Sequence, residues 1–302
     1  MKISAMKKLI LLLVVCFIAL QGEAQFNYQF TDESIPVTGI QYGLVGGGHT
    51  AQLFNRDDVN SLGVQPQFMN FNYFAGAERI RWYTPHFGIG QQALLWNAGA
   101  KYAGPADTSM NAPSLVGTTT LQYAKVPVLF YWKSYSRWKP DRRLRVNTYF
   151  GPYIAMLANA REEWTISLNG SDDFFTYMLE SGSFTAIDKD SNQFFDGNAD
   201  DGELYKFIDY GFVMGAGVEI RLWKRTVVAL TLRTDIGLAE VENKDFKVNT
   251  ATGTRYRFFK DIFSKYQPYG ISSDPNFDYN RPETNNFSIG AQLSIRKYLG
   301  AN

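Results

Sequence analysis

The feature that most constrains the fold is a pair of long segments, Phe207–Leu222 and Thr226–Glu240, joined by the short turn Trp-Lys-Arg. Both segments alternate with period two, which predicts β-strands, because successive side chains of a strand point to opposite faces. One face of each segment is apolar, and the other combines glycine with charged residues such as Glu219 and Asp235. Unpaired charges cannot line the dry core of a soluble β-sandwich. The alternative is that the apolar face meets lipid.

Eight segments of the chain show this period-two character. Most exceed the usual length of strands in soluble proteins and reach or pass the ~9–11 residues that a tilted transmembrane strand needs. Aromatic residues make up 16% of the chain, which is rich for a soluble domain. These observations leave two fold classes, a soluble sandwich and an outer-membrane barrel. The approximate ranges of the segments are Thr38–Leu53, Gln67–Trp82, Phe87–Ala103, Thr118–Ser134, Arg142–Ala158, Phe207–Leu222, Thr226–Glu240 and Asn285–Leu299.

The lengths of the connections decide between these two classes. Long and short connections alternate along the chain, and transmembrane barrels have this asymmetry because their periplasmic turns are short and their extracellular loops are longer. We therefore predict an all-β fold: an eight-stranded antiparallel up-and-down transmembrane β-barrel with short periplasmic turns and long extracellular loops. The long connections are Phe54–Pro66, Gly104–Gly117, Asn159–Lys206 and Val241–Asn286.

The N-terminal residues have the three parts of a secretory signal peptide. Three lysines precede the apolar run Leu9–Leu20, and Gly22–Ala24 supplies a small-residue cleavage site. An uncleaved anchor is the alternative, but this run is shorter than the ~20 apolar residues that a membrane-spanning helix needs. The only cysteine, Cys16, lies within the signal. This position excludes disulfides and cysteine metal sites from the mature chain.

We predict two parts for the chain, a signal peptide at residues 1–24 and a single outer-membrane β-barrel domain at residues 25–302. The longest loops of that domain are expected at about 159–206 and 241–286. Removal of the signal leaves 27 basic and 28 acidic residues, so no electrostatic argument favours nucleic acid as a partner. The expected partners are outer-membrane lipid and, through the long loops, other envelope or secretion proteins.

The inward face of the predicted barrel carries charges of both signs. Side chains fill the interior of an eight-stranded barrel, so we expect these charges to neutralise one another and plug the bore; a gated polar channel is the alternative. The charged residues expected inside are Glu78, Lys101, Arg145, Asp209, Glu219, Arg221, Arg233, Asp235 and Arg296. Aromatic residues near strand ends are expected to form interfacial girdles: Trp82, Tyr83, Trp132, Trp138, Trp223 and Tyr298.

Three stretches, LQYAKVPVLFYWKS, LRVNTYFGPYIAMLANA and FIDYGFVMGAGVEIRL, carry a resemblance to a known family. They resemble the PorT-type outer-membrane β-barrel family common in Bacteroidota, and the similarity extends from about Thr38 to Leu299. The resemblance implies an outer-membrane barrel, and the namesake of the family is associated with type IX protein secretion. This chain differs in its enlarged third and fourth long loops. The matching residues are Tyr123 with Pro127, Gly151 with Pro152, and Asp209 with Gly211, Gly215 and Gly217; Gln25 after the cleavage site also fits.

Candidate chemical sites are few. His49 is expected near the extracellular end of the first strand, but no motif places a serine and a carboxylate beside it, as a catalytic triad requires. His86 is expected to be a solvated turn residue. The acidic stretch Ile187–Glu203 begins like a calcium loop, but Gln193 and Ala199 replace the glycine and the glutamate of that motif. A weak irregular calcium site is the alternative to a solvated acidic loop, which we favour. The acidic and amide residues concerned are Asp188, Asp190, Asn192, Asp196, Asn198, Asp200 and Glu203.

The fourth long loop contains a predicted amphipathic helix at Phe258–Tyr266, followed by Pro268 and Gly270. It could cap the barrel, lie on the membrane or dock a partner. We assign no catalytic, cofactor-binding or metal-binding residues. The sequence favours a non-enzymatic outer-membrane barrel that acts as an interaction or accessory subunit of an envelope or secretion assembly. The alternatives are a small-solute porin-like channel and a barrel enzyme that modifies lipid.

Overall fold

A computed structural model describes the strands of the chain and the short turns between some of them. Among the described residues, no helix has the length and apolar character that a membrane crossing requires. The described ranges are 38–54, 65–67, 70–103, 114–134, 143–167, 175–180, 183–188, 195–198, 205–223, 225–241, 248–249, 255–256 and 284–299. The predicted calcium-loop residues 189–194 and 199–203 and the predicted helix at 258–266 lie outside them, as does the predicted signal peptide.

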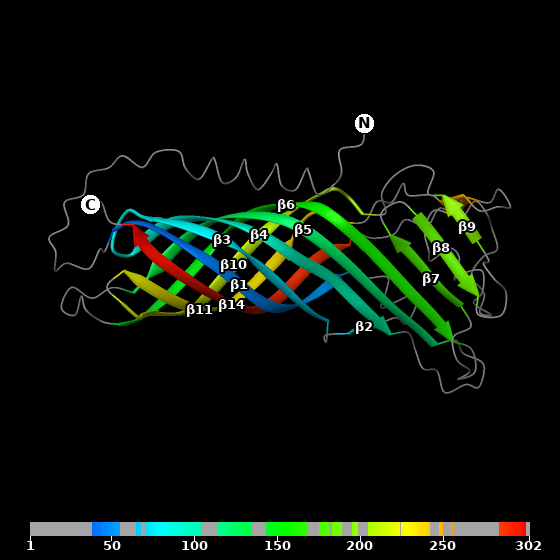
Figure 1. Ribbon diagram of the computed structural model, residues 1–302, viewed down its shortest axis with the longest axis horizontal. Coiled ribbons are helices and arrows are strands. Elements are labelled where there is room, and N and C mark those ends of the chain that lie inside the picture. Colours follow the sequence, from blue (N-terminus) through cyan, green and yellow to red (C-terminus); the bar gives the residue numbers. More distant parts are fainter. Residues whose placement is uncertain are drawn as a thin grey trace.

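Eight long strands form a closed antiparallel barrel (Figure 1). Each strand pairs with its neighbour in the chain, and the ring is closed where the first strand pairs with the last one and where β6 pairs with β10. The predicted up-and-down barrel is therefore confirmed. The barrel strands are β1 (Gly39–Phe54), β3 (Phe71–Trp82), β4 (Phe87–Ala103), β5 (Ser114–Lys133), β6 (Leu144–Ser167), β10 (Ile208–Arg221), β11 (Thr226–Gly237) and β14 (Asn285–Leu299).

The two ends of the barrel differ, as the loop lengths predict. The turn between β3 and β4 spans four residues, Tyr83–His86, and the turn between β10 and β11 is equally tight. In Figure 1 this short-turn end lies at the left, where the arrowhead of β14 also ends. Three-residue strand β2 (Gln65–Gln67) pairs with β4 at the opposite, long-loop end. A small separate hairpin is formed by β12 (Val248–Asn249) and β13 (Arg255–Tyr256).

Strand β6 is much longer than the predicted segment that ends at Ala158. Its last partner in β10 is Met156, but the strand continues to Ser167 while still paired with β5. On its other edge, this continuation pairs with β7 (Phe175–Glu180), which is followed by β8 (Ser183–Asp188) and β9 (Phe195–Asn198). We call β7, β8, β9 and the β6 segment beyond Met156 the extension. It projects past the barrel at the right of Figure 1.

The two faces of the barrel wall are chemically opposite. In β10, Phe212 and Met214 are about half exposed, whereas Val213 between them is buried. Large apolar side chains are exposed on every barrel strand, for example Leu44, Phe150 and Leu232. A ring of strands that leaves no barrel edge and exposes an apolar outer face satisfies its backbone hydrogen bonds internally, as lipid requires.

Three residues lie on the face opposite to the one that the sequence predicted. Lys101 is exposed, because the even-numbered residues of β4, such as Leu94 and Trp96, point inward. Trp82 and Tyr298 are buried inside the barrel, where we predicted interfacial positions. The interior thus contains apolar and aromatic side chains as well as charged ones. Polarity alone therefore does not identify the inward-facing residues of a strand. Of the other predicted girdle residues, Tyr83, Trp132 and Trp223 are exposed, and Trp138 lies outside the described residues.

Candidate functional site

The lumen contains a triad of charges nearer its short-turn end. Arg296 of β14 donates from Nε to Glu78 of β3 over 2.7 Å and from Nη1 to Glu219 of β10 over 3.3 Å. Glu78 also accepts hydrogen bonds from Tyr131 and Gln92. Arg296 has only 1% of its surface exposed, so the ion pairs are shielded from water. One cation lies between two carboxylates here, and the triad connects strands on different sides of the bore.

A buried lysine lies between this triad and the short-turn end. Lys133 of β5 donates to the hydroxyl of Tyr298 over 2.9 Å, and its ammonium lies 3.7 Å from the centre of the Trp82 ring. Trp82 in turn donates from Nε1 to Gln41. A cation over an aromatic face is attracted by the electrons of the ring. These contacts explain why Trp82 and Tyr298 are drawn inward.

A second triad lies nearer the long-loop end and has the reverse composition. Arg233 makes a two-point ion pair with Asp235, at 2.8 and 2.9 Å, and Lys125 of β5 pairs with the same carboxylate at 2.6 Å. Arg233 also donates to Gln92 and Gln292, at 2.8 and 2.9 Å. All three charged residues are buried. Two cations therefore share one carboxylate, the opposite of the Arg296 triad.

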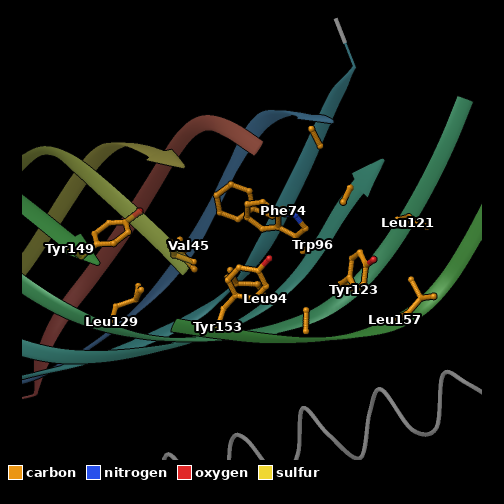
Figure 2. Close-up of a cluster of buried hydrophobic side chains, with 14 of the residues drawn as sticks. Val45, Phe74, Leu94, Trp96, Leu121, Tyr123, Leu129, Tyr149, Tyr153 and Leu157 are labelled. Atoms are coloured by element: carbon orange, nitrogen blue, oxygen red, sulfur yellow. The ribbon is translucent and has the colours of Figure 1, made fainter. Parts of the chain in front are cut away.

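Aromatic side chains fill the space between the charges (Figure 2). The rings of Phe74 and Trp96 stack with centroids 4.6 Å apart, and the guanidinium of Arg233 lies over both rings. The ammonium of Lys125 lies 3.5 Å from the centre of the Tyr153 ring. Figure 2 shows these rings pointing into the space that the strands enclose. The bore is filled by packed side chains, and the predicted plug is supported.

A small pocket remains above the second triad, toward the long-loop end. It holds about 10 Å³ of free space, about enough for one water molecule. Asp209 lines it and accepts hydrogen bonds at Oδ2 from Asn286, at 2.9 Å, and from Tyr153, at 3.3 Å. Its second oxygen, Oδ1, is buried and has no hydrogen-bond partner among the described residues. A pocket of this size has room for about one water molecule.

The two histidines lie in different surroundings. His49 is buried against Trp96, with ring centroids 4.2 Å apart, and neither ring nitrogen has a hydrogen-bond partner among the described residues. A general base must be held and oriented by hydrogen bonds. His86 lies exposed in the turn between β3 and β4, as predicted, and its Nδ1 lies 3.2 Å from the carbonyl oxygen of Lys133.

Sequence reasoning placed most of the charged lumen residues correctly, but it missed others. Glu78, Arg145, Asp209, Glu219, Arg233, Asp235 and Arg296 are buried as predicted, and Arg221 is half-buried on the same inward face. Lys125 and Lys133 were missed. The signal was present, because both lie at odd positions of β5 in phase with Tyr123 and Tyr131. Polar residues within an apolar stretch are easily assigned to the outside.

Glycines of β10 make room for large neighbours at two positions. A Cβ on Gly215 would collide with the ring of Tyr149, and one on Gly211 would lie 2.8 Å from the ring of Tyr153. Asn286 donates to the hydroxyl of Tyr123 and to the carboxylate of Asp209, which also accepts from the hydroxyl of Tyr153. Of the residues that carry the family resemblance, Tyr123, Asp209 and Gly211 therefore lie on the inner wall, whereas Pro152 is exposed.

The closed ring and its apolar outer face decide where the chain resides. It is an eight-stranded outer-membrane β-barrel. No family model matches the sequence, and no curated protein matches it. Solved structures with a similar arrangement include the outer-membrane protein OprG from Pseudomonas aeruginosa, which is 8% identical and has a TM-score of 0.35 over 86% of this chain and 95% of that one.

Two other solved structures have a similar arrangement. Neisserial surface protein A is 8% identical, with a TM-score of 0.32 over 86% of this chain and 99% of that one. The outer-membrane protease OmpT from Escherichia coli is 9% identical, with a TM-score of 0.30 over 90% of this chain and 99% of that one. A shared barrel does not define a function. The function must be argued from the lumen and the extension.

Proposed function

We propose that the chain is a non-enzymatic outer-membrane barrel that acts as an interaction or accessory subunit of an envelope or secretion assembly. The observation that carries this proposal is the extension. It is built on strands far longer than the ~9–11 residues that a membrane crossing needs: β5 has 20 residues and β6 has 24. The chain thus holds an ordered sheet clear of the membrane.

The extension has a backbone suited to recognition. Its strands pair in register, so that Trp164 of β6 lies opposite Tyr177 of β7, and Ala186 of β8 lies between Tyr177 and Phe195 of β9. The outer edge of β9 has no strand paired with it among the described residues, and an open sheet edge can accept a strand from another chain.

The filled lumen argues against the competing functions. A porin-like channel needs a continuous aqueous path, whereas the Arg296 and Arg233 triads and the aromatic rings occupy the bore. A lipid-modifying enzyme needs an activated nucleophile or base, and His49 has no hydrogen-bond partner among the described residues. The resemblance to the PorT-type family supports an assembly role, and type IX protein secretion is the assembly that we propose on that ground.

Extraction of the native complex tests the proposal. The tagged full chain is solubilised from outer membranes in a mild detergent, and mass spectrometry identifies the proteins that accompany it. We expect a defined, stoichiometric partner set. A variant in which a short Gly-Ser turn replaces residues 160–204 should fold, because every pairing between β6 and β10 is kept, but should lose these partners. Replacement of residues 104–113 by a similar turn is the matched control, because it leaves the extension and the neighbouring β12 in place.

A barrel that is extracted alone under all conditions would contradict the assembly role. Conductance in planar bilayers then separates the alternatives, because a plugged barrel gives no unit steps and a channel does. Retention of all partners by the variant lacking β7, β8 and β9 would show that the extension is not the docking element.

A further inference from the structure

The outer surface near the short-turn end carries a row of polar residues on three neighbouring strands. The strand register places Lys297 of β14 opposite Tyr42 of β1, and Tyr42 opposite Arg79 of β3. All three point outward, because Arg296, Tyr298, Gln41, Glu78 and Ile80 beside them are buried in the lumen. Arg81, two residues further toward the short-turn end, also points outward. Facing strands lie ~5 Å apart, so the row spans about 10 Å.

This row lies at the boundary between the membrane and the periplasm. One step toward the middle of the barrel, the next outward row is apolar, with Ile295 opposite Leu44 and Leu44 opposite Ala77. Leu44 has 72% of its surface exposed, as expected for a lipid-facing side chain. The short-turn end of such a barrel faces the periplasm. Lys297, Tyr42 and Arg79 therefore lie at the level of the headgroups of the periplasmic leaflet.

The two cations of the row have no protein anion to neutralise them. No aspartate or glutamate faces outward from β14, β1, β3 or β4, whose only acidic residue is Glu78, inside the lumen. Neither Lys297 nor Arg79 forms an ion pair within the described part of the chain. The guanidinium of Arg79 lies 5.9 Å from the centre of the Tyr42 ring, and its Nε is buried without a hydrogen-bond partner.

The outward strand positions on the opposite side of the ring carry no cation at this level. On β5, β6 and β10, the outward strand residues nearest the short-turn end are apolar: Trp132, Leu144 and Ile220. Basic residues such as Arg143 and Arg225 also lie at this end, outside the strands. A lysine, a tyrosine hydroxyl and an arginine on three adjacent strands provide several donors in one short row, which suits a phosphate oxygen group.

We propose that Lys297, Tyr42 and Arg79 bind the phosphate of an anionic phospholipid in the periplasmic leaflet of the outer membrane. The lipid's acyl chains would lie along Leu44 and Ile295, and Arg81 would add positive charge on the periplasmic side. This site requires only that the barrel span the membrane, and it is independent of the assembly role proposed above. It would fix the height of the barrel relative to the bilayer.

Native mass spectrometry of the full chain tests this site. The protein in neutral detergent is mixed with equal amounts of phosphatidylglycerol and phosphatidylcholine, and the lipid adducts are counted. We expect phosphatidylglycerol to predominate. The double variant Arg79→Gln with Lys297→Gln should bind it roughly thirtyfold more weakly, because each basic group near a charged headgroup contributes about fivefold. A heat-dependent shift in SDS gels confirms that the variant is folded.

The matched control is Arg142→Gln with Arg143→Gln, which removes the same charge from the connection between β5 and β6, at the same end but on the opposite side of the ring from β14, β1 and β3. It should leave phosphatidylglycerol binding unchanged. Equal loss in the two double variants would show a general charge effect and overturn the site. Equal adducts of both lipids would overturn it as well. Displacement of phosphatidylglycerol by inorganic phosphate alone, at equal concentration, would assign the site to free phosphate and reject the lipid.

Discussion

The two charged triads in the lumen have opposite charge compositions. Near the short-turn end one cation, Arg296, serves two carboxylates, and near the long-loop end one carboxylate, Asp235, serves two cations. The first triad depends on its single central residue, whereas the second keeps a two-point ion pair if Lys125 is lost. We therefore expect the contribution of a buried lumen residue to the free energy of unfolding to depend on its position within the charge cluster, and not on its burial alone.

Removal of the central arginine should have the largest effect. Arg296→Met leaves Glu78 and Glu219 buried without their cation, and breaking a buried pair in this way typically costs about 3–5 kcal/mol. Urea titration of the reconstituted barrel measures the free energy of unfolding. Arg225→Met, at an exposed position of the same end, is the control, and it should change that free energy by less than about 0.5 kcal/mol. Similar losses for both variants would contradict the claim that the first triad depends on its central cation.

Removal of the peripheral lysine should cost less. Lys125→Met leaves Asp235 bound to Arg233 at both oxygens, so we expect a loss of about 1–3 kcal/mol, the range for a hydrogen bond to a charged group. The same urea titration compares it directly with Arg296→Met. If Lys125→Met were the more destabilising change, the two triads would not differ as their compositions suggest.

A packing change between the two triads should have an intermediate to small effect. Gly215→Ala places a methyl group against the Tyr149 ring, and overpacking of this kind costs about 1–3 kcal/mol. Tyr149 also donates to Gln292, which joins the Arg233 triad. The double variant Gly215→Ala with Tyr149→Leu should lose less than the sum of the two single changes. Strict additivity in this cycle would show that the two residues do not collide.

The smallest effect is expected in the pocket above the second triad. Asp209→Asn replaces an oxygen that has no partner and keeps an acceptor for Tyr153 and Asn286. We expect the free energy of unfolding to change by less than about 1 kcal/mol, since no ion pair is broken. A loss comparable to that of Lys125→Met would show that the Asp209 charge takes part in the second triad.

Much of the fold could be predicted because a period-two alternation of apolar and polar residues shows both where a strand lies and which of its residues share a face. The bounds of β4 and β14 agree with the predicted segments, and the alternation of loop lengths gave the membrane topology. The sequence could not show that Lys101 points out while Trp82 points in, because small barrels also bury aromatic rings. It also carried no local signal for the partners of Arg296, whose two carboxylates lie 218 and 77 residues away in the chain.

The extension was missed for a different reason. The segment after Ala158 is acidic, and an acidic composition is typical of a solvated loop. We therefore predicted a loop where the structure has strands that pair with the continuation of β6. The period-two pattern alone cannot show that a strand continues beyond its membrane-spanning part. The pairing joins Trp164 with Tyr177, two positions that are 13 residues apart in the chain.

Strand β6 is one uninterrupted length of backbone shared by the barrel wall and the extension. A force applied to β7 or β8 therefore passes into the barrel through covalent bonds and is resisted along the length of the β5–β6 ladder, which runs from Ser114 with Ser167 to Lys133 with Asn147. The register of this ladder shifts between Gln122 and Tyr123, where the extension meets the barrel. The extension is therefore joined to the barrel both by the backbone of β6 and by two stretches of pairing with β5, one on each side of that shift.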